Sequence, residues 1–413
     1  MSAWDGKLDV LVVGGGMISV EVILPTVFQE RRRGKVGKVL VASRTVRTMQ
    51  NVRKLFPTEE ISFYPAPEKG GDAGGKHPHA FRQALKALGK NGVVIVATPD
   101  SAHTSLILES MEAGCHVVVE KPLCLKVAEA RKIRDAADRK AMYVYTDYHK
   151  RHDYAIRAAK YRYENGDLGE MLHGHAWIEE KKEMALETFA SWAHESSPFE
   201  YIGVHYADAY YFITGLLPKR LSAFAQKKFL PGKGIDAYDA VQAVIEWSDG
   251  SAFWVQTSWV LPQSNTSLTN QGMQLTGTKG EYKSDHKDRH TFFNTDEGGY
   301  EHYNPYFFKP YRPWGGPLSS YKNEKEATEW AGYGYESIVL GLDDIRDILK
   351  ATEDLSDDEA FKKRKEIIAA LDKVRPLPRQ STVGTAIAEA ARMSFENQSR
   401  FVSFDEEMNL HLE

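Results

Sequence analysis

Short apolar runs recur at regular intervals along the first third of the chain. Each run is a few residues long and largely apolar, a pattern typical of strands buried on both faces of a sheet. Residues 79–90 and 127–140 lie between such runs and have apolar residues at helical spacing. The predicted strands cover residues 8–13, 38–42, 61–64, 93–97, 115–120 and 142–146. Because strands and helices alternate, we expect a parallel sheet with right-handed crossover connections.

The pattern changes in the second half of the chain. Residues 154–165 have helical spacing, whereas apolar and polar positions alternate in several segments from residue 220 onward. Such alternation is typical of strands with one buried face, and residues 248–250 (SDG) are a hairpin signal between two of them. The predicted strands cover residues 221–228, 238–247, 251–259, 273–276 and 281–283, and later helices cover residues 335–349, 357–372 and 385–397. We therefore expect an open mixed or antiparallel sheet here.

A glycine-rich turn follows the first predicted strand. The sequence from Gly14 to Ser19 is GGGMIS, and it opens a predicted helix. Gly14 permits a tight turn, and Gly16 lets a pyrophosphate approach the backbone at the helix N-terminus. This arrangement predicts a dinucleotide site, with Met17 and Ile18 among the cofactor contacts. Ser19 stands where glycine or alanine is usual, but it is small enough for close helix–strand packing.

These elements define an α/β protein with two domains, which a length of 413 residues also favours. We expect an N-terminal Rossmann dinucleotide-binding domain over residues 1–148. A C-terminal α+β domain with a large open mixed or antiparallel sheet is expected over residues 149–413. The last predicted helix, residues 385–397, is expected to pack back on the first domain.

Composition narrows the possible partners. A hydrophobic fraction of 42% and a charged fraction of 27% are typical of a soluble globular protein, and a net charge of -4 favours neither nucleic acid nor an anionic membrane as partner. The two cysteines, Cys115 and Cys124, match no metal or redox spacing, so we predict no metal site. The N-terminus shows no signal-peptide pattern. We expect a cytoplasmic protein without a membrane segment.

The end of the second predicted strand bears on the choice of cofactor. An NAD-binding protein normally has an acidic residue there for the ribose 2′-hydroxyl, but this chain has Ser43, Arg44 and Thr45. A hydroxyl and a guanidinium suit a 2′-phosphate, so NADP is favoured and NAD stays possible. Alternatively, Arg44 stacks on the adenine, which either cofactor would allow.

Lys121 stands at the end of the fifth predicted strand, in the sequence HVVVEKP. Pro122 cannot donate to a strand ladder and therefore ends the strand. The carboxyl ends of parallel strands are where open α/β sheets bind ligands, and a lysine with a packed stem at such a place suits acid–base work. The alternative is a surface lysine paired with Glu120.

Three motifs together resemble the GFO/IDH/MocA oxidoreductases. They are GGGMIS after the first strand, ATPDSAH after the fourth and VVVEKP after the fifth. The resemblance implies that Lys121 lies beside the nicotinamide and a substrate hydroxyl. The cofactor contacts that we expect are Gly14, Gly16, Met17, Ile18, Ser43, Arg44, Thr98, Pro99, His103, Glu120 and Lys121.

A second part of the resemblance lies at residues 196–208, SSPFEYIGVHYAD. The family pattern D-x-G-x-H-x-x-D is met by Gly203, His205 and Asp208, which implies that His205 joins Lys121 at the substrate. Tyr201 occupies the position of the first aspartate, and Glu200 precedes it. Either Tyr201 or Glu200 could take over the role of the missing carboxylate.

The expected catalytic residues are therefore Lys121, His205 and Tyr201. Substrate contacts are expected from Lys121, Lys150, Arg151, Glu200, Tyr201 and His205. The basic cluster that contains Lys150 and Arg151 is compatible with a cofactor phosphate, an acidic substrate or a solvated interdomain face. The aromatic segment 290–335 suits sugar rings and a subunit contact equally.

The resulting hypothesis is an NAD(P)-dependent oxidoreductase that moves a hydride between nicotinamide and a secondary alcohol of a sugar, polyol or glycoside. Two alternatives remain. One is an enzyme that cleaves glycosides by transient oxidation with bound NAD, and the other is a dinucleotide-sensing regulator without catalysis. We expect a carbohydrate substrate and a homo-oligomer, a dimer or tetramer, assembled through the C-terminal sheet.

Overall fold

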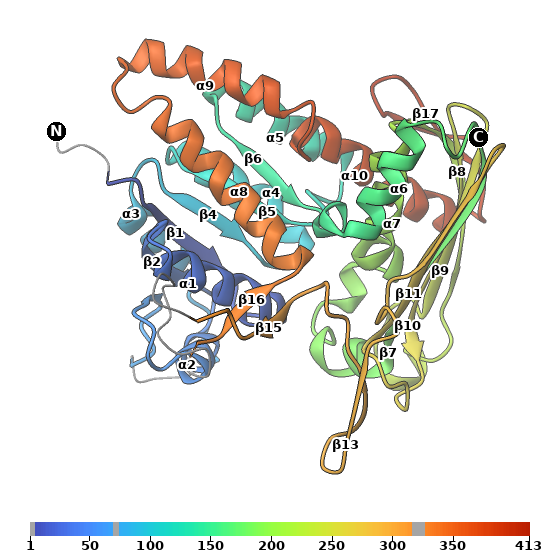
Figure 1. Ribbon diagram of the computed structural model, residues 1–413, viewed down its shortest axis with the longest axis horizontal. Helices are drawn as coiled ribbons and strands as arrows, with labels where there is room; N and C mark the ends of the chain where they lie inside the picture. Colours follow the sequence, from blue (N-terminus) through green and yellow to red (C-terminus); the bar gives the residue numbers. More distant parts are fainter. Residues whose placement is uncertain (1–4, 69–73, 316–326) are drawn as a thin grey trace. The chain divides into compact units, whose positions relative to one another are not determined.

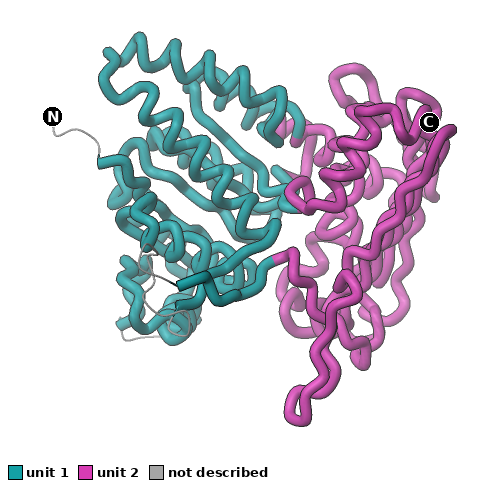
Figure 2. The backbone as a smooth tube through the Cα atoms, viewed as in Figure 1, with its two compact units in different colours: residues 1–123, 131–149, 308–380 teal, residues 124–130, 150–307, 381–413 magenta. Residues whose placement is uncertain are grey.

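The computed structural model describes residues 5–68, 74–315 and 327–413. Parts of the predicted surface insertion at 65–78 and of the aromatic segment at 290–335 lie outside the described residues. The chain forms two compact units, coloured separately in Figure 2. Unit 1 comprises Met1–Leu123, Arg131–His149 and Phe308–Gln380, and unit 2 comprises Cys124–Ala130, Lys150–Phe307 and Ser381–Glu413.

Unit 1 is built on a six-stranded parallel sheet with the order β3-β2-β1-β4-β5-β6. This order is that of the Rossmann fold, which confirms the predicted N-terminal architecture. The central strands are apolar on both faces because helices cover both. The strands are β1 (Leu8–Val13), β2 (Val36–Ala42), β3 (Ser62–Tyr64), β4 (Val93–Val96), β5 (His116–Glu120) and β6 (Val144–Asp147).

The helices of unit 1 mostly alternate with these strands (Figure 1). They are η1 (Ser19–Ile23), α1 (Leu24–Arg32), α2 (Val46–Leu55), α3 (Ala80–Leu88), η2 (Asp100–Ala102), α4 (His103–Glu112), α8 (Tyr333–Lys350) and α9 (Asp357–Leu371). Helix α5 (Val127–Lys140) begins in unit 2 and continues in unit 1. The strands β15 (Lys309–Tyr311) and β16 (Glu329–Ala331) form a separate pair.

The division of the chain differs from the predicted one after residue 307. Helix α8 belongs to unit 1, because Ile338, Leu342 and Ile345 share one hydrophobic core with the central strands. Gly341 permits the close approach, since a Cβ there would lie 3.1 Å from Val118 Cγ2. The apolar spacing of residues 335–349 predicts a helix, but it does not reveal which sheet the helix covers.

Unit 2 contains an eight-stranded mixed sheet, as predicted, with the order β12-β11-β7-β10-β9-β8-β17-β18. The central pair β7 and β10 is parallel and the other pairs are antiparallel. The strands are β7 (Met171–Lys181), β8 (Pro218–Gln226), β9 (Ala240–Trp247), β10 (Ala252–Leu261), β11 (Thr269–Gly277), β12 (Glu281–Asp285), β17 (Val402–Phe404) and β18 (Leu410–Leu412). A hairpin of β13 (Phe292–Thr295) and β14 (Gly299–His302) carries part of the aromatic segment.

Helices line one face of this sheet (Figure 1). They include α6 (Tyr154–Glu164), α7 (Val204–Thr214) and most of α10 (Pro378–Glu396). The short helical segments in this part of the chain are η3 (His149–His152), η4 (Met184–Thr188), η5 (Ala193–Glu195), η6 (Phe199–Gly203) and η7 (Pro231–Lys233). The part of α10 from Ser381 onward belongs to unit 2, where the Ala223 amide donates to Ser394 Oγ (2.9 Å). The expected packing of this helix on the first 148 residues is found at residues 124–127, which belong to unit 2. The Val127 amide donates to Glu389 Oε2 (2.7 Å), and Thr385 Oγ1 donates to the Cys124 carbonyl (3.3 Å).

The other face of the sheet exposes apolar side chains. Phe224, Val244 and Trp254 are 55%, 43% and 45% exposed, and Val244 and Trp254 are register partners on adjacent strands. The rings of His175 and Trp254 lie 5.0 Å apart, which extends the apolar surface onto β7. Among the helices of the described residues, no segment has the length and apolar character to cross a membrane.

Candidate functional site

The glycine turn of unit 1 forms the cradle that a dinucleotide requires. Gly14 has a φ of +118°, and a Cβ there would lie 2.0 Å from the Ala97 carbonyl oxygen, so only glycine fits. A Cβ on Gly16 would meet nothing within 4 Å, which leaves its backbone open to an approaching group. The buried Ser19 hydroxyl at the start of η1 has no hydrogen-bond partner among the described residues. These residues fit a bound pyrophosphate.

The loop after β2 has the basic character that the sequence indicates. Ser43 is half-buried and donates its amide to the Tyr64 carbonyl (2.9 Å), whereas the Arg44 side chain is exposed. Within the described part of the chain, Arg44 makes no side-chain hydrogen bond or ion pair, and its carbonyl accepts from the His77 amide (2.7 Å). The exposed Arg47 lies one helical turn further along. Both guanidinium groups are thus available to an anionic ligand.

The His103 ring contacts both of the loops that follow β4 and β5, which carry other expected cofactor residues. Its ring is fully buried, with Nδ1 2.9 Å from the Pro122 carbonyl and Nε2 3.0 Å from the Thr98 carbonyl. Burial lowers the pKa of His103 to about 4, although both carbonyls favour the protonated ring. Thr98 and Pro99 are half-buried at the end of β4. This geometry gives His103 a positioning role, and its expected direct contact with the cofactor stays a prediction.

Glu120 and Lys121 lie at the carboxyl end of β5 and are only 8% and 7% exposed. Lys121 is therefore not the surface lysine of the alternative interpretation. Asp147, the register partner of Glu120 on β6, brings a second buried carboxyl to this strand end. Burial and the nearby Asp147 raise the pKa of Glu120 well above its usual range, and burial raises the pKa of Asp147 to about 6. Asp147 is not among the predicted site residues, although it directly follows the predicted strand at 142–146, and that position was the available signal.

In unit 2, Tyr201 and His205 lie in one continuous helical segment formed by η6 and α7. Their spacing of four residues puts the two side chains on the same side of the helix. His205 is 5% exposed, and Tyr201 packs its ring 5.2 Å from Trp192 and 6.2 Å from Trp259. The structure thus brings together the two residues that the motif places in this unit.

The Glu200 side chain does not lie on the same side of the helix as those of Tyr201 and His205. Its buried carboxylate accepts hydrogen bonds from Nε (2.6 Å) and Nη2 of Arg392 on α10. A buried carboxylate with a bidentate arginine partner has a structural role, because separating the two would leave a charge without compensation. This pairing gives Glu200 a structural role, and the expected substrate contact of Glu200 stays a prediction. Arg392, some 190 positions away, gave no sequence signal for this pairing.

Arg151 likewise forms a buried ion pair. Its Nε and Nη2 donate to Oδ2 (2.8 Å) and Oδ1 (2.7 Å) of Asp208, and both side chains are buried. This pair explains the last carboxylate of the D-x-G-x-H-x-x-D pattern, which joins α7 to the segment before α6. Arg151 thus forms a structural ion pair, and its expected substrate contact stays a prediction.

Lys150 begins a buried polar network in unit 2. Its Nζ donates to Gln271 Oε1 and lies 4.9 Å from the centre of the Tyr206 ring. The Tyr206 hydroxyl is 2.9 Å from His286 Nδ1, and His286 Nε2 is 3.1 Å from the Tyr282 hydroxyl. Burial lowers the pKa of Lys150 to about 7, with Asp153 opposing and Arg289 adding to the effect. Lys150 is thus inside unit 2 and not on a solvated face.

The fold of unit 1 and its glycine cradle define the class of protein, a dinucleotide-binding protein of the Rossmann type. The family model for the oxidoreductase family with an NAD-binding Rossmann fold matches residues 8–148. The model for the GFO/IDH/MocA C-terminal domain matches residues 156–283. The chain belongs to the GFO/IDH/MocA family of oxidoreductases.

Curated relatives agree with this assignment, and a solved structure shares the fold. D-glucoside 3-dehydrogenase of Escherichia coli K12 is 25% identical over 207 residues, which cover 46% of this chain and 58% of that protein. The scyllo-inositol 2-dehydrogenase (NAD(+)) of Bacillus subtilis 168 is 25% identical over 190 residues, covering 45% and 53%. The chain thus spans little more than half the length of these relatives. The fold is shared with scyllo-inositol dehydrogenase from Lactobacillus casei with bound NAD(H) and scyllo-inositol (TM-score 0.63, 14% identity, 96% and 99% coverage).

Proposed function

We propose that the protein is an NAD(P)-dependent dehydrogenase or reductase that acts on a secondary alcohol or ketone of a sugar, polyol or glycoside. The observation that carries the proposal is the buried Lys121 at the carboxyl end of β5, in a Rossmann sheet that also has the glycine cradle. The named relatives, which act on a glucoside and an inositol, support the substrate class.

Each residue has a distinct part in the proposed reaction. Gly14 and Gly16 hold the pyrophosphate, and the bound dinucleotide supplies the hydride acceptor at its nicotinamide. Lys121 takes the hydroxyl proton as the alcohol is oxidised and returns it in the reverse reaction. His205 orients the same hydroxyl, and Tyr201 replaces the family's first aspartate as its polar neighbour. Tyr201 is favoured over Glu200 because Arg392 already engages the Glu200 carboxylate.

For the cofactor, we infer a preference for NADP. Arg44 and Arg47 are both exposed beside the end of β2, and residues 43–48 contain no acidic side chain. A 2′-phosphate at this place would gain charge-assisted hydrogen bonds and meet no carboxylate.

The open face of the sheet in unit 2 supports the proposed homo-oligomer. Phe224, Val244 and Trp254 present an apolar surface whose solvent exposure is unfavourable, and a second copy of the chain would cover it. Because the two copies would contribute the same face, a two-fold dimer is the simplest assembly.

The test is a spectrophotometric screen of the purified protein with sugars, inositols and glycosides, each with NAD and with NADP. The proposal expects reduced nicotinamide to accumulate with at least one such alcohol. Cleavage of a glycoside without a net absorbance change would favour the glycoside-cleaving alternative. Cofactor binding without turnover of any compound would favour the regulator.

A further inference from the structure

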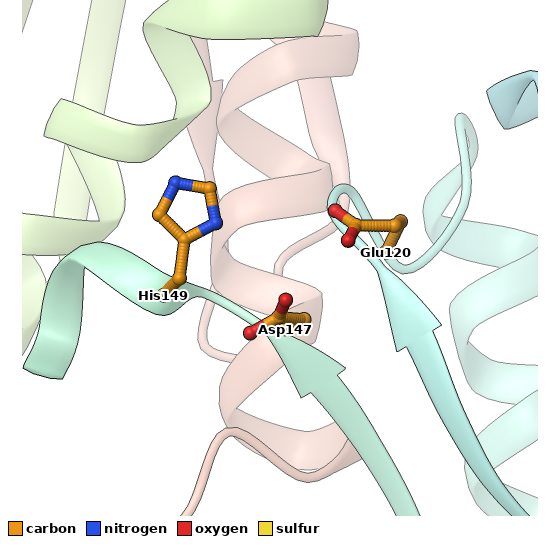
Figure 3. A group of neighbouring side chains, drawn as sticks. All are labelled: Glu120, Asp147 and His149. Atoms are coloured by element: carbon orange, nitrogen blue, oxygen red, sulfur yellow. The ribbon is translucent and has the colours of Figure 1, made fainter. Parts of the chain in front are cut away.

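Three ligand-type side chains meet inside unit 1 without any signal in the spacing of the sequence. Glu120, Asp147 and His149 each offer one donor atom, and these atoms lie within 4.8 Å of one another. All three residues are buried. Figure 3 shows the two carboxylates and the imidazole ring turned toward the same small region.

The parallel sheet produces this meeting. Glu120 and Asp147 are register partners at the carboxyl ends of β5 and β6. Adjacent strands lie about 4.8 Å apart, so side chains at paired positions point the same way from the sheet. His149 lies two residues after Asp147, in η3, and its ring lies close to the two carboxylates (Figure 3).

Two further observations indicate a ligand at this place. Glu120 Oε1 is buried, accepts no hydrogen bond within the described part of the chain and belongs to the cluster in Figure 3. The other two side chains are fixed by α8, since Ser337 Oγ donates to Asp147 Oδ1 and the His149 ring stacks at 5.7 Å on that of Tyr333. Outer partners of this kind hold metal ligands in position.

We propose that Glu120, Asp147 and His149 bind one first-row divalent cation such as Mn²⁺ or Zn²⁺. Two carboxylate oxygens and an imidazole nitrogen are ligands that these ions accept, and the two carboxylates neutralise the charge of the cation. With metal–ligand bonds of about 2.1 Å, tetrahedral ligand atoms lie about 3.4 Å apart, so side chains whose donor atoms lie up to 4.8 Å apart need to close by up to about 1.4 Å. Three protein ligands leave coordination positions open for water or another oxygen ligand.

The proposal is independent of the proposed function, because it concerns binding of a cation by unit 1. A second group, Asp285, Asp288 and His290, provides the matched control. It is more exposed, and Asp288 already accepts from the His290 amide (2.8 Å) and pairs with Lys287 (3.3 Å).

The experiment uses the full chain after treatment with a chelator. Mn²⁺ and Zn²⁺ are titrated separately by calorimetry, bound metal is counted by mass spectrometry, and Co²⁺ serves as a visible-spectrum probe of the ligand field. The proposal expects one equivalent per chain. Affinity should fall by about a hundredfold or more in Asp147→Asn and in His149→Phe, which retains a ring to stack on Tyr333. Asp285→Asn should bind as the unmodified chain does.

Absence of binding at millimolar Mn²⁺ and Zn²⁺ would overturn the proposal. In that case a proton shared between Glu120 and Asp147 would reduce the negative charge of the two carboxylates. Undiminished binding in both folded variants, or loss of binding in Asp285→Asn, would also overturn it. If Asp147→Asn does not fold, His149→Phe and the Co²⁺ spectrum of the unmodified chain decide the question, because carboxylate and imidazole ligands shift and intensify the weak visible band of the aquo ion.

Discussion

Replacement of the buried Lys150 by methionine should remove a pH dependence of stability from unit 2. Burial lowers the pKa of this lysine from 10.5 to about 7, and its ammonium faces Gln271, Tyr206, Asp153, Arg289 and His286. The unfolded chain keeps the Lys150 proton up to about pH 10.4, whereas the folded chain releases it near pH 7. Between these values the unfolded state binds more protons, so the free energy of unfolding rises with pH.

The size of the effect follows from the shift. One pKa unit corresponds to 1.36 kcal/mol, so the buried lysine costs about 5 kcal/mol below pH 7, and this cost is relieved as the pH rises to about 10.5. From pH 7 to 9 the unmodified chain should gain about 2–3 kcal/mol relative to Lys150→Met. The methionine also removes one of the two donors to Gln271 Oε1 and leaves only the longer bond from the Tyr206 hydroxyl (3.4 Å). This loss costs about 1–3 kcal/mol at every pH and therefore does not change the slope.

Urea unfolding followed by tryptophan fluorescence at pH 7.0, 8.0 and 9.0 measures this difference. The exposed Lys279 of the same unit supplies the control, since Lys279→Met should leave the pH dependence of the unmodified chain intact. Parallel pH dependences for Lys150→Met and the unmodified chain would refute the argument, because they would mean that Lys150 keeps its proton in the folded state.

Three further predictions follow from other parts of the molecule. Arg44→Ala should weaken NADP binding by about 1.5–3 kcal/mol, measured by fluorescence titration, and leave NAD binding unchanged; equal affinities of the unmodified chain for both cofactors would contradict the assignment. Tyr201→Phe should reduce turnover without changing cofactor affinity. Glu200→Gln should chiefly lower the melting temperature, because it weakens the pairing with Arg392. The reverse pattern would mean that Glu200, and not Tyr201, contacts the substrate. Trp254→Glu should dissociate the oligomer in sedimentation velocity, while Glu246→Gln on the adjacent strand should not, and a monomeric unmodified chain would dismiss this interface.

The sequence predicts the Rossmann sheet well because most of its strands are short, largely apolar runs that end in recognisable turn residues. Strand β7 escapes prediction because Gly174 and Glu180 stand at buried positions and Trp177 stands on the more exposed face, so apolar and polar residues do not alternate clearly. Local patterns also do not reveal that α8 returns to the first sheet, since its apolar stripe would fit either unit.

At the candidate site too, residues in local motifs can be predicted from the sequence, whereas contacts between distant segments cannot. Gly14, Lys121 and His205 stand in short motifs, so the sequence reveals them. The side chains that pair with Glu200 and Arg151 come from distant segments. Arg392 donates to the Glu200 carboxylate, and Arg151 donates to Asp208. Asp147 meets Glu120 only through the register of β5 and β6, which no local pattern specifies.

The central claim, that Lys121 carries the proton during hydride transfer, is tested most directly by the turnover of Lys121→Ala with a substrate found in the screen. The variant should bind the dinucleotide through the glycine cradle, and its turnover should fall by roughly a hundredfold or more, the scale of a positioned acid–base group. Lys121→Arg should not restore turnover, because a guanidinium stays protonated, and Lys126→Ala, at a half-exposed lysine nearby, should be nearly normal. Near-normal turnover by a Lys121→Ala variant that binds cofactor would contradict the account.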